Sequence, residues 1–135
     1  MMNKLIIAGT RTFNNYQLLK DSINAEKVGM VISGGAAGAD ALGIEFAKEH
    51  NIPYEVYYAD WHKYGKAAGP IRNKEMVQKA NCAIFFWDGV SRGTANCIAL
   101  ATSKGIPVKV IPITDADKVQ RNEIPGQMDI NHLLQ

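Results

Sequence analysis

Long hydrophobic runs are absent from this 135-residue sequence. The longest aliphatic or aromatic stretches, residues 5–8 and 82–87, fall far short of the roughly 20 residues that a membrane-spanning helix needs. Near the start of the chain, only four apolar residues stand between Lys4 and Gly9, too few for the apolar region of a signal peptide. We therefore expect no membrane span and no export, and hence a cytoplasmic protein.

Cysteine is scarce as well. Cys82 and Cys97 are the two cysteines, and neither belongs to a Cys-x-x-Cys pair or to a Cys/His cluster. A structural zinc ion or a disulfide framework requires such spacings. Asp115 and Asp117 are interpreted as a solvated turn and not as a metal site. The sequence therefore predicts no metal and no required cofactor, and the two thiols suit a reducing compartment.

A strong excess of one charge is the third missing feature. Fifteen Lys and Arg residues against thirteen Asp and Glu residues give a formal net charge of +2. Proteins that track a nucleic-acid backbone neutralise many phosphates and usually carry a basic excess. Nucleic acid is therefore not the expected partner. With 47% hydrophobic and 21% charged residues, the composition is that of one ordinary globular domain.

Five short apolar runs alternate with segments of helical periodicity. The expected strands are residues 5–8, 30–32, 54–58, 82–87 and 108–113, and the expected helices begin near residues 15, 39, 70 and 94. Continuous apolar runs are typical of buried parallel strands, whereas the half-polar run after Pro53 is typical of a sheet edge. The pattern predicts an α/β fold: a single Rossmann-like doubly wound domain, with a mostly parallel five-stranded sheet and helices on both faces.

Two segments fall outside this alternation. Residues 59–69 are interpreted as a loop that ends where Pro70 begins a helix. The pattern dissolves near the C-terminus, so we divide the chain into a domain at 1–113 and a tail or strap of the same domain at 114–135. In open parallel sheets, ligands bind outside the carboxyl ends of the strands. A binding site is therefore expected among the loops that follow the strands.

Glycine is concentrated in two of these loops. Residues 34–40 read Gly-Gly-Ala-Ala-Gly-Ala-Asp between a strand and a helix, where small residues allow backbone N–H groups to approach an anion. The loop lacks both the dinucleotide pattern Gly-x-Gly-x-x-Gly and the lysine of the nucleoside-triphosphate loop. It is interpreted as a phosphate cradle, and the alternative is that its glycines only allow tight packing of strand on helix.

The second glycine turn, residues 88–94, also joins a strand to a helix. The two turns would face one crevice if strands 5–8 and 82–87 are neighbours in the sheet. Arg11 follows the first of these strands, where it would either grip a phosphate or carboxylate with two hydrogen bonds or be solvated.

Aromatic and basic residues bracket the segment between the third strand and the next helix. Trp61 and His62 stand at one end, and Arg72 and Asn73 stand at the other. A ring beside basic groups suits a base that must be stacked while its phosphates are neutralised. The alternative is that Trp61 packs the loop onto the domain. His62 has no serine or aspartate partner at a diagnostic spacing, so a nucleophilic triad is not predicted.

Four motifs, taken in order, resemble the SLOG superfamily, which includes DNA-processing proteins and LOG enzymes. Within it they resemble the small YpsA-related branch that is common in bacteria and phages. The motifs are Gly9-x-Arg11, Ser33-Gly34-Gly35-Ala36-x-Gly38-Ala39-Asp40, Trp61 with Gly65-x-x-Ala68-Gly69-x-x-Arg72-Asn73-x-x-Met76, and Trp87-Asp88-Gly89-x-Ser91-x-Gly93-Thr94. The resemblance spans residues 4–113. It implies a Rossmann-like sheet that binds nucleotides or nucleotide-derived ligands, including molecules of the ADP-ribose type.

One branch of the superfamily, the LOG enzymes, hydrolyses the N-glycosidic bond of nucleoside monophosphates with a glutamate and an upstream arginine. The resemblance matches Arg72 to that arginine and residues 93–94 to a Gly-Thr pair, but it places Cys97 at the glutamate. A developing oxocarbenium ion needs a nearby carboxylate, which a neutral thiol cannot replace. Asp88 or Asp40 could supply that charge from another direction. Arg72 and Asp88 are the expected catalytic residues if the protein is an enzyme.

Residues and resemblance together lead to one hypothesis and two alternatives. We expect the protein to bind a nucleotide-derived small molecule, of the ADP-ribose or NAD-derivative type, for sensing or sequestration in phage or defence signalling. The alternatives are a nucleotide N-glycosidic hydrolase and single-stranded DNA binding. A homodimer or higher homo-oligomer is expected by analogy. The expected ligand-binding residues are Gly9, Arg11, Ser33, Gly34, Gly35, Gly38, Asp40, Trp61, Arg72, Asn73, Asp88, Gly89, Ser91, Gly93 and Thr94.

These residues have distinct expected roles. The two glycine turns would hold phosphates, and Arg11 and Arg72 would neutralise them. Asp88 or Asp40 would accept ribose hydroxyls, and Trp61 would cover the base.

Overall fold

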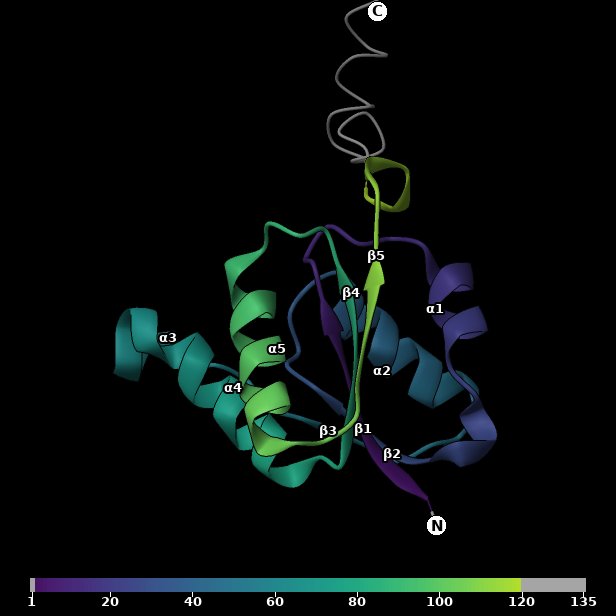
Figure 1. Ribbon diagram of the computed structural model, residues 1–135, viewed down its shortest axis with the longest axis horizontal. Helices are drawn as coiled ribbons and strands as arrows, with labels where there is room; N and C mark the ends of the chain where they lie inside the picture. Colours follow the sequence, from purple (N-terminus) through teal and green to yellow (C-terminus); the bar gives the residue numbers. More distant parts are fainter. Residues whose placement is uncertain (1, 120–135) are drawn as a thin grey trace, which may run out of the picture.

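The computed structural model describes residues 2–119 and contains a five-stranded sheet (Figure 1). The strands are β1 (Asn3–Gly9), β2 (Val28–Ser33), β3 (Tyr54–Val56), β4 (Cys82–Trp87) and β5 (Val108–Pro112). Their order is β3-β2-β1-β4-β5, and every neighbouring pair is parallel. The predicted α/β class and parallel five-stranded sheet are confirmed, and β3 lies at an edge as expected.

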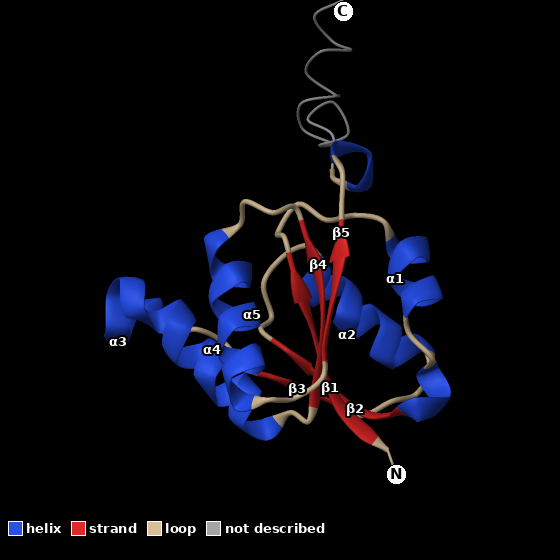
Figure 2. Cartoon of the chain, viewed as in Figure 1, coloured by secondary structure: helices blue, strands red, loops and turns tan. Residues whose placement is uncertain are grey.

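Helices cover both faces of this sheet. The α-helices are α1 (Tyr16–Ser22), α2 (Ala39–Glu49), α3 (Trp61–Tyr64), α4 (Ala68–Lys79) and α5 (Arg92–Lys104), and the 3-10 turns are η1 (Ala25–Lys27), η2 (Gly65–Ala67) and η3 (Asp115–Asp117). Figure 2 shows α1 and α2 on one side of the strands and α4 and α5 on the other. Within residues 2–119, no helix is long and apolar enough to cross a membrane.

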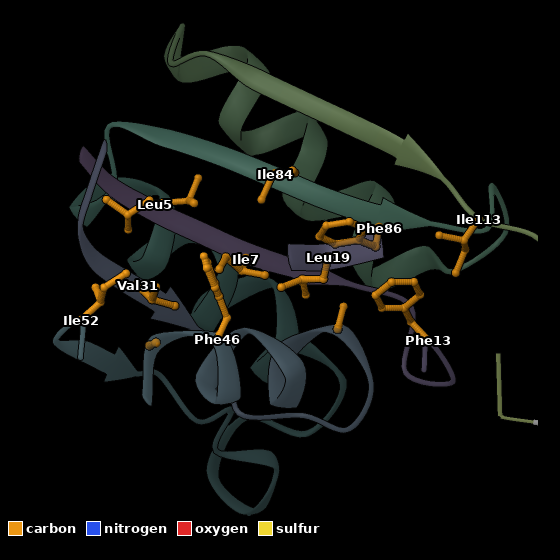
Figure 3. Packing of buried hydrophobic residues seen from close by; sticks show 13 residues of the cluster. Leu5, Ile7, Phe13, Leu19, Val31, Phe46, Ile52, Ile84, Phe86 and Ile113 are labelled. Carbon is orange, nitrogen blue, oxygen red and sulfur yellow. The ribbon is translucent and has the colours of Figure 1, made fainter. Parts of the chain in front are cut away.

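Successive residues of the central strands bury opposite faces of the sheet. Ile7 of β1 and Phe86 of β4 pack in one cluster with Phe46 of α2 (Figure 3). Ile6 and Phe85, their neighbours in the chain, belong to the cluster under α4 and α5. Burial on both faces explains why these strands are continuous apolar runs. The pairing of β1 with β4 brings their carboxyl ends together, which is the condition for the two glycine turns to share one crevice.

The segment 59–69, interpreted from the sequence as a loop, is largely helical. Asp60 caps α3, since its Oδ1 accepts a hydrogen bond from the Lys63 N–H at 3.0 Å. η2 then leads into α4, which begins at Ala68, two residues before Pro70. Proline fits there because the first N–H groups of a helix have no partner within it. The loop interpretation was wrong because one helical turn is too short to show periodicity.

Part of the C-terminal segment packs against the loop that follows β1. The Asn14 N–H donates a hydrogen bond to the Asp117 carbonyl at 2.7 Å, and a further backbone bond joins Val119 to Thr12 at 2.8 Å. The remainder of the segment expected as a tail or strap, residues 120–135, lies outside the described residues.

Candidate functional site

A cavity of about 350 Å³ opens at the carboxyl edge of the sheet. It lies where β1 and β4 end side by side, and the loops that follow these strands form two of its walls. Figure 2 shows both loops at the same end of the sheet, leading to α1 and α5. The residues predicted from the sequence that line the cavity are Gly9, Arg11, Asp40, Arg72, Asn73, Asp88, Ser91, Gly93 and Thr94, and Cys97, at the position matched to the LOG glutamate, lines it as well.

The N-terminus of α5 is open toward this cavity. The helix begins at Arg92, two residues before the expected start, and the N-cap Ser91 makes no side-chain cap hydrogen bond. A side chain added at Gly93 would meet open space, and no acidic residue lies in the first turn. The first N–H groups of a helix lack partners within it and carry a partial positive charge, to which Arg92 adds a full one. A bound anion would stabilise this arrangement.

Arg72 is the most firmly held of the three arginines that line the cavity. Its Nη1 donates to the backbone carbonyls of Gly34 at 2.6 Å and of Tyr57 at 3.3 Å, and its Nε donates to Asn73 Oδ1 at 2.9 Å. Within residues 2–119, no protein acceptor engages Nη2. That edge of the guanidinium is therefore available to a ligand.

Asn73 connects this arginine to the start of α5. The side chain is buried, and its amide nitrogen donates to the Gly93 carbonyl at 3.2 Å and to Asn96 Oδ1 at 3.0 Å. Because its own Oδ1 accepts from Arg72, Asn73 fixes the guanidinium relative to the helix end. Its described hydrogen bonds are made with protein, so it supports the site more directly than it contacts a ligand.

Asp40 is the buried carboxyl group of the cavity, with 6% of its surface exposed. Its Oδ2 accepts a hydrogen bond from the Ala36 N–H at 3.2 Å, and no described residue donates to Oδ1. Burial raises the pKa of Asp40 to about 6, although the Ala36 N–H and the charges of Arg72 and Arg11 act in the opposite direction. The group therefore suits two tasks, accepting a hydrogen bond from a hydroxyl and exchanging a proton near neutral pH.

Cys97 lies in the cavity wall beside this carboxyl group and is 2% exposed. Burial, and the charge of Asp40 after it, raise the pKa of the Cys97 thiol to about 12. The position that the resemblance matches to the LOG glutamate therefore carries a neutral thiol at neutral pH. Both cysteines are free, and within residues 2–119 no three His, Cys, Asp or Glu side chains are grouped so as to hold a metal ion.

Asp88 holds its own turn together. Its Oδ1 accepts hydrogen bonds from the N–H groups of Val90 and Ser91, each at 2.9 Å, while Oδ2 pairs with Lys118 at 3.2 Å. Burial by itself would raise the pKa of Asp88, but these hydrogen bonds and the lysine outweigh it and hold the pKa below its usual range. Both oxygens are engaged with protein, which argues against the expected roles of Asp88 in catalysis and in binding ribose hydroxyls.

Thr10 joins the loop after β1 to the turn after β4. Its Oγ1 accepts hydrogen bonds from the Asp88 N–H at 3.1 Å and from the Ser91 hydroxyl at 3.3 Å. On the other side, Gly38 has a φ of +75°, and a Cβ there would overlap the backbone of Thr10 and Arg11. Gly38 is therefore needed for the close packing of these two loops, and Arg11 is carried to the cavity as a result.

The first glycine loop is occupied by side chains of the protein itself. A Cβ at Gly34 would lie 2.6 Å from Arg72 Nη1 and 2.8 Å from Asp40 Oδ2. One at Gly35 would lie 2.5 Å from a ring carbon of Tyr58. These two glycines make room for protein groups, as the packing alternative supposes. The open backbone of the site is at the start of α5.

Six residues predicted for the site lie outside the cavity lining. Ser33 is buried below it, where its hydroxyl donates to the Asp40 carbonyl at 3.0 Å. Trp61 is 51% exposed, and its ring contacts Gly69 of α4. The six are Ser33, Gly34, Gly35, Gly38, Trp61 and Gly89.

Sequence reasoning missed Thr10, Arg92 and Lys118. Thr10 directly follows β1, and Arg92 begins α5 after the turn that follows β4, so their position after a strand was the available signal. Lys118 belongs to a segment without any pattern, and only the structure brings it to Asp88.

Together, the fold and the site define a Rossmann-like α/β domain with a cavity, lined by three arginines, at the carboxyl edge of its sheet. The X-ray structure of DNA processing protein A (DprA) from Streptococcus pneumoniae has the same fold, with a TM-score of 0.70 and 17% sequence identity. The match covers 99% of this chain and 56% of the DprA chain, so the chain spans little more than half of that protein.

Sequence comparison narrows the class. Residues 3–64 match the YspA, cpYpsA-related SLOG family. Gene 61 protein of Mycobacterium phage D29 is 35% identical over 118 residues, which cover 79% of this chain and 94% of the phage protein. The chain belongs to the SLOG superfamily, in its YspA, cpYpsA-related family. The resemblance noted in the sequence is thereby confirmed.

Proposed function

We propose that the cavity binds a phosphate-bearing, nucleotide-derived small molecule of the ADP-ribose or NAD-derivative type, for sensing or sequestration. The open N-terminus of α5, which faces a cavity lined by Arg11, Arg72 and Arg92, carries the proposal. A helix N-terminus and guanidinium groups are both suited to phosphate oxygens. The cavity volume of about 350 Å³ falls within the range of small-molecule sites.

The charge balance of the lining favours an anion. Three arginines face two carboxyl groups, and one of these, Asp88, is already paired with Lys118. The other, Asp40, has one oxygen without a described donor and is the group that would accept a ribose hydroxyl. A ligand that presents a phosphate to α5 and a hydroxyl to Asp40 satisfies both features.

Membership in the SLOG superfamily suggests nucleotide-related binding or DNA processing. The similarity to a phage protein supports a role connected with phage biology. A protein that senses or sequesters a nucleotide signal fits both observations.

A thermal-shift panel tests the proposal, with AMP, ADP, ADP-ribose, NAD and short single-stranded DNA as ligands, followed by chromatography of each mixture. A ligand at about 100 times its dissociation constant adds about 2.7 kcal/mol to the free energy of unfolding. We expect a shift with a phosphate-bearing nucleotide that is recovered intact. No shift with any member of the panel would contradict the proposal.

Arg92→Ala is the sharpest variant, because Arg92 is exposed and has no described protein partner, whereas loss of Arg72 would also leave the Gly34 carbonyl unpaired. Lys48→Ala, which removes the same charge from an exposed position at the far end of α2, is the matched control. We expect Arg92→Ala to lower the affinity for AMP about tenfold or more and to leave the affinity for adenosine unchanged. Lys48→Ala should change neither affinity. Equal losses for AMP and adenosine would contradict the role of Arg92.

Hydrolysis of a nucleotide N-glycosidic bond is the second candidate, and Asp40 is the observation that favours it. This carboxyl group lines the cavity close to the charge of Arg72 and has a pKa of about 6. It would stabilise positive charge developing on the sugar, the task of the LOG glutamate whose position Cys97 occupies here. Release of free base from AMP by the wild type, abolished in Asp40→Asn, would favour the hydrolase over the sensor. Single-stranded DNA binding would be recognised by a steep dependence on salt.

A further inference from the structure

Tyr58 is the most exposed aromatic side chain of the described residues, with 74% of its surface exposed. It follows β3, so it lies at the same carboxyl edge of the sheet as the cavity. The ring rests against Gly35, because a Cβ on that glycine would lie 2.5 Å from Tyr58 Cε1. Gly35 has a φ of +72°, a conformation that suits glycine, and its missing side chain leaves the space that the ring occupies.

A continuous series of groups connects this ring to the cavity. Arg72, which lines the cavity, donates through Nη1 to the carbonyls of Gly34 and Tyr57. Each of these residues directly precedes one member of the Gly35–Tyr58 contact. The guanidinium therefore joins the two backbone segments that hold the ring against the loop.

The order of the strands sets the separation. The cavity lies at the end of β1, and Tyr58 follows β3, two positions along the sheet. With neighbouring strands about 4.8 Å apart, the ring is displaced along the edge by about 10 Å from the end of β1 and by about 14 Å from the end of β4, which leads to α5. A ligand that reaches both must extend along the sheet edge past Arg72.

We infer that Tyr58 is the platform on which the base of the nucleotide stacks when its phosphate is bound at the start of α5. This inference rests on the proposed function and deepens it, because it names the class of ligand. An extended nucleotide, with a diphosphate between its base and the group held in the cavity, matches the separation. The exposed ring face supplies a stacking surface that tolerates different bases.

The other exposed aromatic residues are less suited to this role. Tyr64 has the ammonium group of Lys63 over its ring, at 5.0 Å from the centroid. Trp61, expected from the sequence to cover the base, packs its ring against Gly69 of α4 and is less exposed than Tyr58, at 51%. Tyr54 is at the start of β3, toward the opposite end of the strand.

The test compares ADP-ribose with ribose 5-phosphate, which has no base, by calorimetric titration of the full chain. We expect Tyr58→Ala to lower the affinity for ADP-ribose by about 5-fold to 100-fold and to leave the affinity for ribose 5-phosphate unchanged. Tyr58→Phe, which keeps the ring, should bind like the wild type. Tyr64→Ala, which removes an exposed tyrosine from α3, is the matched control and should also bind like the wild type.

The outcomes separate this inference from the proposed function. If the wild type binds ADP-ribose and Arg92→Ala weakens it, but Tyr58→Ala does not, the stacking role is overturned and the proposed function stands. Equal weakening of both ligands by Tyr58→Ala would also overturn it, since the loss would then be independent of the base. If the wild type binds neither ligand, both proposals fall. A thermal melt of each variant confirms that it is folded.

Discussion

Replacing Asp40 with asparagine is expected to stabilise the protein, and to do so more at neutral than at acid pH. The carboxyl group is 6% exposed, and burial raises its pKa from 3.8 to about 6. A raised pKa means that the native state disfavours the charged form relative to the unfolded state. The native state therefore binds more protons between these two pKa values, and stability falls as the pH rises through that interval.

The size of the effect follows from the two pKa values. Their separation corresponds to about 3 kcal/mol of destabilisation at pH 8, where the group is charged in both states. At pH 5 the native carboxyl is mostly protonated, and the destabilisation falls to roughly half of that value. Asparagine retains an oxygen that can accept the Ala36 N–H and carries no charge. The gain in free energy of unfolding that the variant shows over the wild type should therefore shrink by on the order of 1 kcal/mol between pH 8 and pH 5.

Urea denaturation of both proteins at pH 5 and pH 8 measures this change. Glu45→Gln, which neutralises an exposed carboxylate on the same helix, is the matched control. The difference in free energy of unfolding between this variant and the wild type should not shrink between pH 8 and pH 5. If Asp40→Asn raises the free energy of unfolding equally at the two pH values, or more at pH 5, the reasoning is refuted. The same variant should bind the hydroxyl-bearing ligand less well, because its single oxygen accepts the Ala36 N–H and the NH2 group that replaces Oδ1 cannot accept a hydrogen bond.

Two further predictions concern stability: one compares substitutions at Gly93 and Gly38, and the other concerns Asp88 in the turn after β4. Gly93→Ala should raise the free energy of unfolding by about 0.5 kcal/mol, because the added methyl meets open space within a helix, and should weaken a phosphate-bearing ligand. Gly38→Ala should lower it by about 1–3 kcal/mol, because φ is +75° and the methyl would overlap the backbone of Arg11. Urea denaturation checks both signs, and the same sign for both would contradict this account. Asp88→Ala should lower the free energy of unfolding by about 1–2 kcal/mol, since two turn N–H groups lose their acceptor, and Asp88→Asn should lower it less. Equal losses, measured in the same way, would show that the turn does not depend on that oxygen.

The parallel sheet could be predicted because its strands are continuous apolar runs. Ile6 and Ile7 bury opposite faces of the sheet, so neither position tolerates a polar residue, and the run is visible in the sequence. α3 could not be predicted, because it is a single turn held by Asp60 and has no buried residue to mark it. Local capping and tertiary packing, more than periodicity, decide such short elements.

The candidate site was predictable in location but not in the division of roles. Strand ends and glycine turns pointed to the carboxyl edge of the sheet. Gly34 makes room for Arg72, whereas Gly93 leaves open space at the start of α5. The sequence shows glycine at both positions and does not distinguish these two roles. Asp88 and Asp40 were equally plausible ligand groups until their hydrogen bonds were seen.

Recognition of a phosphate by the open end of α5 is the basis of the proposed function. The most direct measurement is a pair of calorimetric titrations, of AMP and of adenosine, with the wild type and with Arg92→Ala. We expect the wild type to bind AMP much more tightly than adenosine and Arg92→Ala to remove most of this difference. Equal affinities of the wild type for AMP and adenosine, or a preference that survives in Arg92→Ala, would contradict it.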